Sequence, residues 1–158
     1  MKVALAAVVA VGLAIGFLIP SGEGGKAPAA AASAATAAPG ETRLARAPSG
    51  HFHTEALVNG TPVEFVVDTG ATSVALTMRD ARRIGIDFDP EQFAVVGTGA
   101  SGPVRGQEVV IERVSVDGKE VQTLRGVVLE GLGISLLGQA YLSRISSVEM
   151  AGDQMVLR

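Results

Sequence analysis

The chain has 158 residues, a formal net charge of −3, no cysteine and 47% hydrophobic residues. Without cysteine it cannot form a disulfide framework, a thiolate metal site or a cysteine nucleophile. The slight acidity and the lack of any basic run exclude the electrostatic surface that a nucleic-acid partner requires. Only the part from His51 onward has the composition to bury a core, so we expect one domain.

The N-terminal segment, residues 1–20, reads as a transmembrane anchor or signal segment. Lys2 precedes the uncharged stretch Val3–Ile19, which as a helix would be about 26 Å long, close to the thickness of a bilayer core. A cleaved signal peptide is the alternative, but Pro20–Lys26 does not contain the usual small-residue cleavage site. We therefore expect an uncleaved anchor, with the basic end in the cytoplasm and the remainder exported.

Residues 21–49 are mostly Ala, Pro, Gly, Ser and Thr. Such a composition cannot bury enough apolar surface to offset the entropy of ordering, so this stretch predicts a flexible linker. The folded domain is then expected to occupy residues 50–158.

Most of that domain reads as short β-strands. Asn59-Gly60 and Asp117-Gly118 are strong signals for tight hairpin turns, because both residues of each pair tolerate positive φ. Many short strands with closely spaced turns favour an all-β fold, a small barrel or sandwich of antiparallel character. The expected strands are 51–58, 61–67, 93–96, 104–116, 119–124, 127–129, 145–150 and 154–157, with short helices at 78–84 and 139–143.

The first candidate for chemistry is Asp68-Thr69-Gly70-Ala71, directly after the apolar strand 61–67. A carboxylate at the end of a buried strand is costly unless it is hydrogen-bonded or functional. Gly70 allows a sharp turn whose N–H groups point back at the carboxylate. The alternative is an ordinary turn, because Asp, Thr and Gly all favour turns.

A second element about 70 residues later decides between these interpretations. Leu136-Leu137-Gly138 is followed by a short predicted helix. Together with the Asp-Thr-Gly-Ala turn, this pattern resembles the retropepsin-like aspartic proteases, specifically the bacterial single-domain, membrane-tethered type. The resemblance covers about His51 to Arg158. It implies a small closed β-barrel in which the two elements cross as a ψ-shaped pair of loops beneath the active site.

The resemblance also implies a mechanism. Aspartic proteases use two Asp side chains that share one proton and activate a water molecule between them. This chain has one Asp-(Thr/Ser)-Gly, because Asp117-Gly118 lacks the middle hydroxyl. The second carboxylate is therefore expected to be Asp68 of another copy, in a symmetric homodimer. Thr69, Gly70 and Ala71 would support the active-site loop, and no metal or other cofactor is expected.

The Gly-rich connection Gly97-Thr98-Gly99-Ala100-Ser101-Gly102 spells the dinucleotide-binding fingerprint. That fingerprint needs a helix to begin there, whereas the residues that follow predict a strand, so nucleotide binding is disfavoured. In the family this position is the flap, a hairpin that closes over the substrate. His51 and His53 share a strand face, but without a third ligand we read them as structural.

The resemblance implies an endopeptidase that binds an extended polypeptide, on the periplasmic side of a bacterial inner membrane and anchored there through Val3–Ile19. Two rival interpretations remain. One is a non-catalytic binding module that retains the fold, and the other is a structural, membrane-tethered dimer. The first predicts that Asp68→Asn leaves the function intact, and in the second Asp68 only satisfies buried amide groups.

Overall fold

The computed structural model describes residues 40–99 and 102–158, so Val3–Ile19 and most of the expected linker lie outside the described residues. In chain order the elements are β1 (Thr42–Ala45), β2 (His53–Val58), β3 (Thr61–Val67), β4 (Val74–Thr77), α1 (Met78–Arg83), the 3₁₀ turn η1 (Pro90–Gln92), β5 (Ala94–Gly99), β6 (Gly102–Val116), β7 (Lys119–Leu129), β8 (Ser135–Leu137), α2 (Gln139–Leu142), β9 (Val148–Ala151) and β10 (Gln154–Leu157). Within the described ranges, no helix has the length and apolar character needed to span a bilayer.

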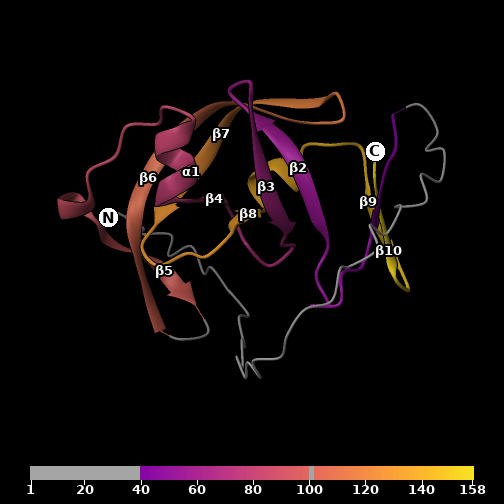
Figure 1. The fold of residues 1–158 in the computed structure, drawn as a ribbon, viewed down its shortest axis with the longest axis horizontal. Coiled ribbons are helices and arrows are strands. Elements are labelled where there is room, and N and C mark those ends of the chain that lie inside the picture. Colours follow the sequence, from indigo (N-terminus) through magenta and orange to yellow (C-terminus); the bar gives the residue numbers. More distant parts are fainter. Residues whose placement is uncertain (1–39, 100–101) are drawn as a thin grey trace, which may run out of the picture.

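Six of these strands form a closed barrel, which confirms the expected barrel architecture (Figure 1). The strand order is β2-β3-β8-β4-β7-β6, and β6 closes the barrel by pairing with β2 at Val58↔Val114. The sheet is mixed rather than antiparallel, because β3 runs parallel to β8 and β4 runs parallel to β7. Sequence patterns did not reveal this mixture, since β4 and β8 are short and were not predicted as strands.

The core of the barrel is aliphatic and aromatic, and α1 packs on its outside. Phe65, Leu76, Ile111, Leu137 and Tyr141 are almost completely buried. Such close-packed side chains hold the short strands in one register, so the loops at the strand ends start from fixed positions.

Helix α1 begins and ends with the residue types that local sequence predicts. The Thr77 hydroxyl accepts a hydrogen bond from the Asp80 N–H, which satisfies one of the free donors at the helix start. Gly85 follows the last turn with a φ of +75°, a conformation that glycine adopts without strain. The predicted helix 78–84 is confirmed to within one residue.

The two predicted hairpin turns are also confirmed. Asn59 and Asp117 both have positive φ, and the glycine after each does too.

One strand prediction is wrong, because 119–124 and 127–129 form the single strand β7. Gly126, between the two predicted segments, lies where a Cβ would come within 2.8 Å of the Ile111 side chain. Because Gly126 has no side chain, β7 packs closely against β6 there and continues without interruption.

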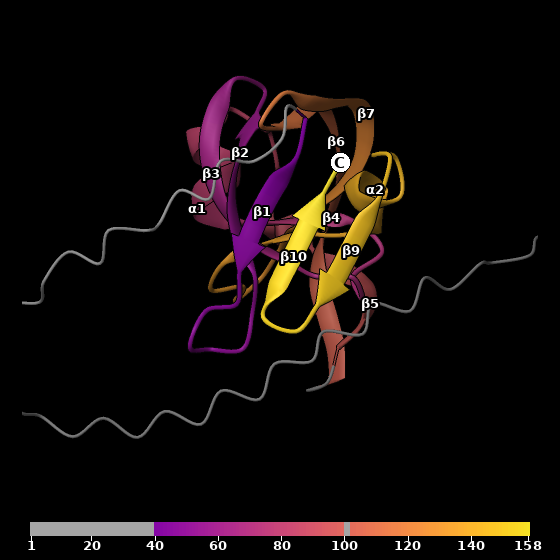
Figure 2. The same ribbon diagram turned by 90° about the vertical axis from the view of Figure 1, so that its right-hand side faces the viewer.

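A separate three-stranded sheet joins the two ends of the domain, in the order β1-β10-β9 (Figure 2). Strand β1 pairs with β10 from Thr42↔Leu157 to Ala45↔Gln154. The linker expected to run to residue 49 therefore ends earlier, and the domain begins before residue 50. Strand β1 has four residues and no flanking turn signal, and its partner β10 lies at the other end of the chain. It therefore has no local sequence pattern that would predict it.

Candidate active site

Asp68 lies at the C-terminal end of β3, where a buried strand reaches the protein surface. Its backbone N–H donates a hydrogen bond to the Leu137 carbonyl over 3.1 Å. Its carboxylate Oδ1 accepts a hydrogen bond from the Gly70 N–H over 2.9 Å, and the Ala71 N–H donates to the Asp68 carbonyl over 3.3 Å. The backbone thus orients the carboxylate, while the side chain remains partly open to solvent.

Strand β8 crosses directly beside this turn. It runs parallel to β3 with Val67 opposite Leu137, and Leu136 and Leu137 are both buried. At Gly138 the chain passes so close to the Asp68 loop that a Cβ would lie 2.2 Å from the Ser73 carbonyl oxygen. No side chain fits in that space. The apolar-apolar-Gly element therefore lies against the Asp68 loop, as the family resemblance implied.

The first residues of α2 complete the crossing. The Gln139 N–H donates to the Ala71 carbonyl over 2.8 Å, and the Ala140 N–H donates to the Thr72 carbonyl over 2.9 Å. The Gln139 side-chain amide also donates to the carbonyl of Thr69 over 2.9 Å. The sequence analysis missed this role of Gln139, although its place directly after Gly138 was a usable signal.

The hairpin of β5 and β6 projects beside the Asp68 loop, where the resemblance implied a flap. Gly97 pairs with Val104, and Gly99 pairs with Gly102. No helix follows Gly99 in the described residues, because β6 begins at Gly102, so the strand predicted there is confirmed. Thr98 lies in β5, whereas Ala100 and Ser101 fall outside the described residues.

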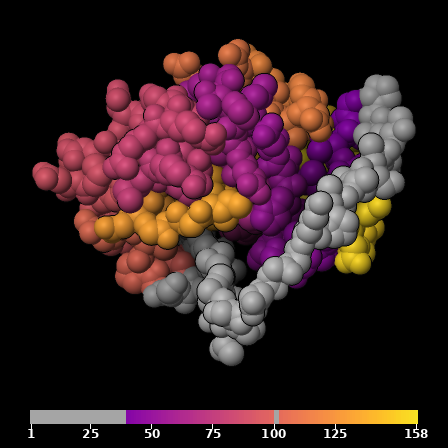
Figure 3. All heavy atoms as spheres, viewed as in Figure 1, coloured from indigo at the N-terminus to yellow at the C-terminus, as the bar shows by residue number. Residues whose placement is uncertain are grey.

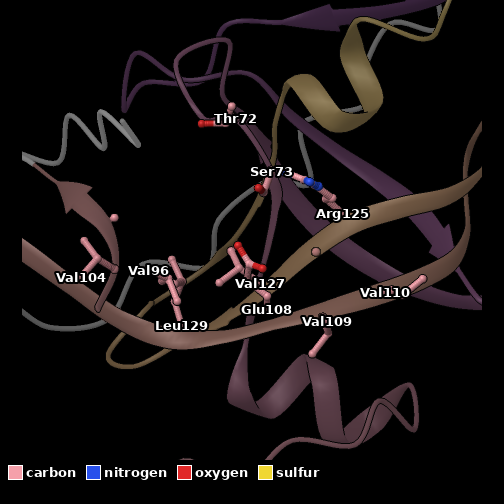
Figure 4. A pocket seen from close by; sticks show the side chains of 12 residues that line it. Thr72, Ser73, Val96, Val104, Glu108, Val109, Val110, Arg125, Val127 and Leu129 are labelled. Atoms are coloured by element: carbon pink, nitrogen blue, oxygen red, sulfur yellow. The ribbon is translucent and has the colours of Figure 1, made fainter. Parts of the chain in front are cut away.

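A groove of about 430 Å³ separates this hairpin from the loop that follows Asp68 (Figure 4). Thr72 and Ser73 form one side, and Val96, Gly97 and Val104 form the other. Val127 and Leu129 of β7 lie along it, and Glu108 and Arg125 contribute the charged side chains. We call this the flap groove. A narrow, largely aliphatic groove with a few polar groups is suited to binding an extended chain.

Residues 54–144 match the family described as "gag-polyprotein putative aspartyl protease", which covers more than half of the chain. The chain belongs to this family of retropepsin-like aspartic proteases. A crystal structure of a retropepsin-like aspartic protease from Rickettsia conorii is similar to it, with 34% identity and a TM-score of 0.62. That similarity covers 75% of this chain and 89% of the other.

Two curated relatives are similar over the same share of the chain. The uncharacterized protein RP867 of Rickettsia prowazekii is 34% identical over 119 residues, which cover 75% of this chain and 51% of the relative. An uncharacterized protein in the cobV 5′ region of a Sinorhizobium species is 33% identical over 120 residues, which cover 75% and 52%. The chain thus spans about half the length of these curated relatives.

In this retropepsin-like domain a buried carboxylate, Asp80, links α1 to the strand beside the Asp68 turn. Hydroxyl groups of Thr77 and Ser135 donate to Asp80 Oδ2 over 2.8 and 2.7 Å, and Arg83 donates to Oδ1 over 3.2 Å. Burial alone would raise the pKa of Asp80, but the hydrogen bonds from Ser135 and Thr77, together with Arg79 and Arg83, lower it. Asp80 is therefore held as an anion.

The hydrogen bonds around Asp80 also fix the strand that lies beside the Asp68 turn. The Ser135 hydroxyl also accepts a hydrogen bond from the Thr77 N–H over 3.1 Å, so it connects β4 to β8, the strand that crosses beside the Asp68 turn. On the face shown in Figure 3, the segment leading into β8 lies as an orange band below the magenta residues of α1. The sequence placed Asp80 only within the predicted helix 78–84. The Ser135 hydroxyl that meets it could not be anticipated.

Proposed function

We propose that the chain is an aspartic endopeptidase whose active centre is formed by two copies of Asp68, one from each subunit of a homodimer. The observation that carries this proposal is the Asp68 turn: the Gly70 N–H orients a carboxylate that is open to solvent and that no cation among the described residues pairs with. Thr69 and Gly70 beside it are exposed, so a second copy can approach along a two-fold axis.

In the proposed reaction, a water molecule lies between the two carboxyl groups, which share one proton because two such close charges cannot both ionise. The ionised carboxylate takes a proton from water as the oxygen attacks the peptide carbonyl carbon. The protonated carboxyl group donates its proton to the carbonyl oxygen. Collapse of the tetrahedral diol, with protonation of the nitrogen, gives a carboxylic acid and an amine. The pair titrates as one unit.

The substrate proposed is a polypeptide in extended conformation. The flap groove has a strand of the hairpin on one side and the loop after Asp68 on the other, and the backbone of an extended chain would hydrogen-bond to such edges while alternate side chains enter the groove. Gly97, Thr98 and Gly99 give the hairpin little side-chain bulk at its end, so a substrate backbone could come close to it.

The proposal is tested by incubating the full chain with a diverse peptide mixture and identifying the products by mass spectrometry. The matched control is Asp68→Asn, which keeps the shape of the side chain but removes its charge. We expect cleavage by the wild type and none above background by Asp68→Asn. Equal cleavage by both proteins, or none by either, would contradict the proposed activity and favour a non-catalytic binding or structural module.

We also propose that Val3–Ile19 anchors the protein in a bacterial inner membrane with the protease domain on the periplasmic side. Its support is the uncharged stretch of 17 residues behind a basic start. Cells expressing the full chain should retain it in the membrane pellet after alkaline carbonate washing. Protease added to spheroplasts should then digest the domain. Release by carbonate, or protection from the added protease, would refute this topology.

A further inference from the structure

The flap groove is aliphatic near the end of the flap hairpin, and its charged side chains lie further along. We call that further part, which Val109 and Val110 also line, the polar end. Val96, Val104 and Leu129 line the part closer to the end of the flap hairpin, and Ser73 and Arg125 lie at the opposite part (Figure 4). The register of β6 and β7 sets this order, since Gly106 pairs with Leu129 and the strands run on from there away from the hairpin end. An extended peptide in the groove would therefore meet aliphatic and polar surroundings at different positions.

Two opposite charges lie at the polar end without neutralising each other. Glu108 is opposite Val127 and Arg125 is opposite Val110, so the two charged residues are diagonal neighbours on adjacent strands. Both are exposed. Within residues 40–99 and 102–158, neither side chain forms an ion pair or a hydrogen bond with another residue, whereas nearby Arg105 pairs with Glu130. In Figure 4 both side chains extend into the groove, Arg125 toward Ser73.

A carboxylate and a guanidinium that face the same space select by complementarity. The carboxylate of Glu108 only accepts hydrogen bonds, and the guanidinium of Arg125 only donates them. A substrate carboxylate would pair with Arg125 but would be repelled by Glu108. A substrate ammonium group would pair with Glu108 but would be repelled by Arg125. A side-chain carboxamide carries both an acceptor oxygen and a donor NH₂, so it can satisfy both residues without a charge conflict.

We propose that Glu108 and Arg125 are specificity-determining residues that select a glutamine or asparagine side chain at the substrate position reaching the polar end of the flap groove. This inference rests on the proposed endopeptidase function. Because a symmetric dimer has two copies of the groove, the preference applies on both sides of the cleaved bond. The aliphatic part of the groove takes a small apolar side chain closer to that bond.

The test begins with one peptide that the wild-type chain cleaves. Each residue flanking the cleaved bond is replaced in turn by Gln, Glu or Lys, and kcat/KM is measured for each peptide. At one position on each side, Gln should be preferred over both charged residues by about fivefold, the size expected when one exposed charged interaction is lost. At positions outside the groove the three residues should be cleaved equally.

Charge-removing variants then separate the two roles. Glu108→Gln should leave Arg125 unopposed and shift the preference at that position toward Glu, whereas Arg125→Gln should shift it toward Lys. The matched control is Glu112→Gln on the same strand, an exposed acid that does not line the flap groove, and it should keep the preference for Gln. Cleavage with the same preferences in all variants, or shifts in the same direction in both, would overturn the inference.

A binding measurement keeps this result separate from the fate of the proposed activity. Fluorescently labelled peptides with Gln, Glu or Lys at the same position are titrated with full chains carrying Asp68→Asn, with and without Glu108→Gln or Arg125→Gln. The dissociation constants should show the same shifts in preference. Glu108→Gln should favour the Glu peptide, and Arg125→Gln should favour the Lys peptide. If these shifts in binding preference appear but the wild type cleaves no peptide, the endopeptidase proposal is contradicted and the selectivity of Glu108 and Arg125 is supported. If the wild type cleaves peptides but the binding preferences do not shift, the selectivity is contradicted and the endopeptidase proposal is supported.

Discussion

The crossing beneath Asp68 and the terminal sheet β1-β10-β9 are held together in different ways. At the crossing, buried backbone groups meet at distances that allow one arrangement: Gly138 passes the Ser73 carbonyl with no room for a side chain. In the terminal sheet, partly exposed ion pairs join the strand ends, such as Arg158 with Glu41 at 2.7 Å. We infer that the active site depends on steric fit, whereas the terminal sheet gains a smaller, salt-sensitive contribution from its charges.

The largest expected effect is that of Gly138→Ala. The new Cβ would collide with two backbone oxygens, those of Ser73 and Ala71 at 2.2 and 2.6 Å, which cannot move without displacing the Asp68 loop. We expect a loss of about 3 kcal/mol or more in the free energy of unfolding, measured by urea denaturation. The matched control is Gly133→Ala, where nothing lies within 4 Å of the new Cβ. If both variants are equally stable, the crossing is not sterically fixed.

An intermediate effect is expected for Asp80→Asn. The side-chain amide has one acceptor oxygen where the carboxylate has two, so it cannot satisfy Thr77, Ser135 and Arg83 together, and a cost of about 2 kcal/mol follows for a buried group left unsatisfied. Asp87→Asn, at an exposed carboxylate, is the control. Thermal unfolding followed by circular dichroism measures both, and equal melting temperatures would show that the network does not stabilise the domain.

The same network predicts a pH dependence. Because folding lowers the pKa of Asp80, its contribution is fully present above the pKa that it has in the unfolded chain. The contribution is lost as the pH falls through the lower folded-state pKa. The difference in melting temperature between the wild type and Asp80→Asn should therefore shrink in acid. A difference that grows on acidification would have the wrong sign.

The smallest effect is expected in the terminal sheet, for Arg158→Gln. The hydrogen bond from Arg158 lowers the pKa of Glu41, so this pair stabilises the folded state at neutral pH and loses its effect in acid. Both side chains are partly accessible to solvent, so salt should screen the interaction. We expect a small drop in melting temperature at low ionic strength that disappears at high salt. A drop of the same size at high salt would show that the sheet depends on more than charge.

The parts of the fold that the sequence predicted are those with local causes. Asn59-Gly60, the helix predicted at 78–84 and the Asp-Thr-Gly turn each fix their own backbone through neighbouring residues. The parts that it missed depend on distant partners. Ser135 meets Asp80 across 55 residues of sequence, and Glu41 meets Arg158 across 117. The polar end of the flap groove likewise arises from the register of β6 and β7, which no single strand reveals.

The central claim is that one active centre needs Asp68 from two subunits. Full-length wild type and Asp68→Asn are co-refolded in varied proportions at a constant total concentration, so that subunits combine at random, and the initial rate of peptide cleavage is measured. If both carboxylates are required, the rate should follow the square of the wild-type fraction, because mixed dimers are inactive. A rate that falls in direct proportion to the wild-type fraction would mean that each subunit acts alone, and would contradict the account.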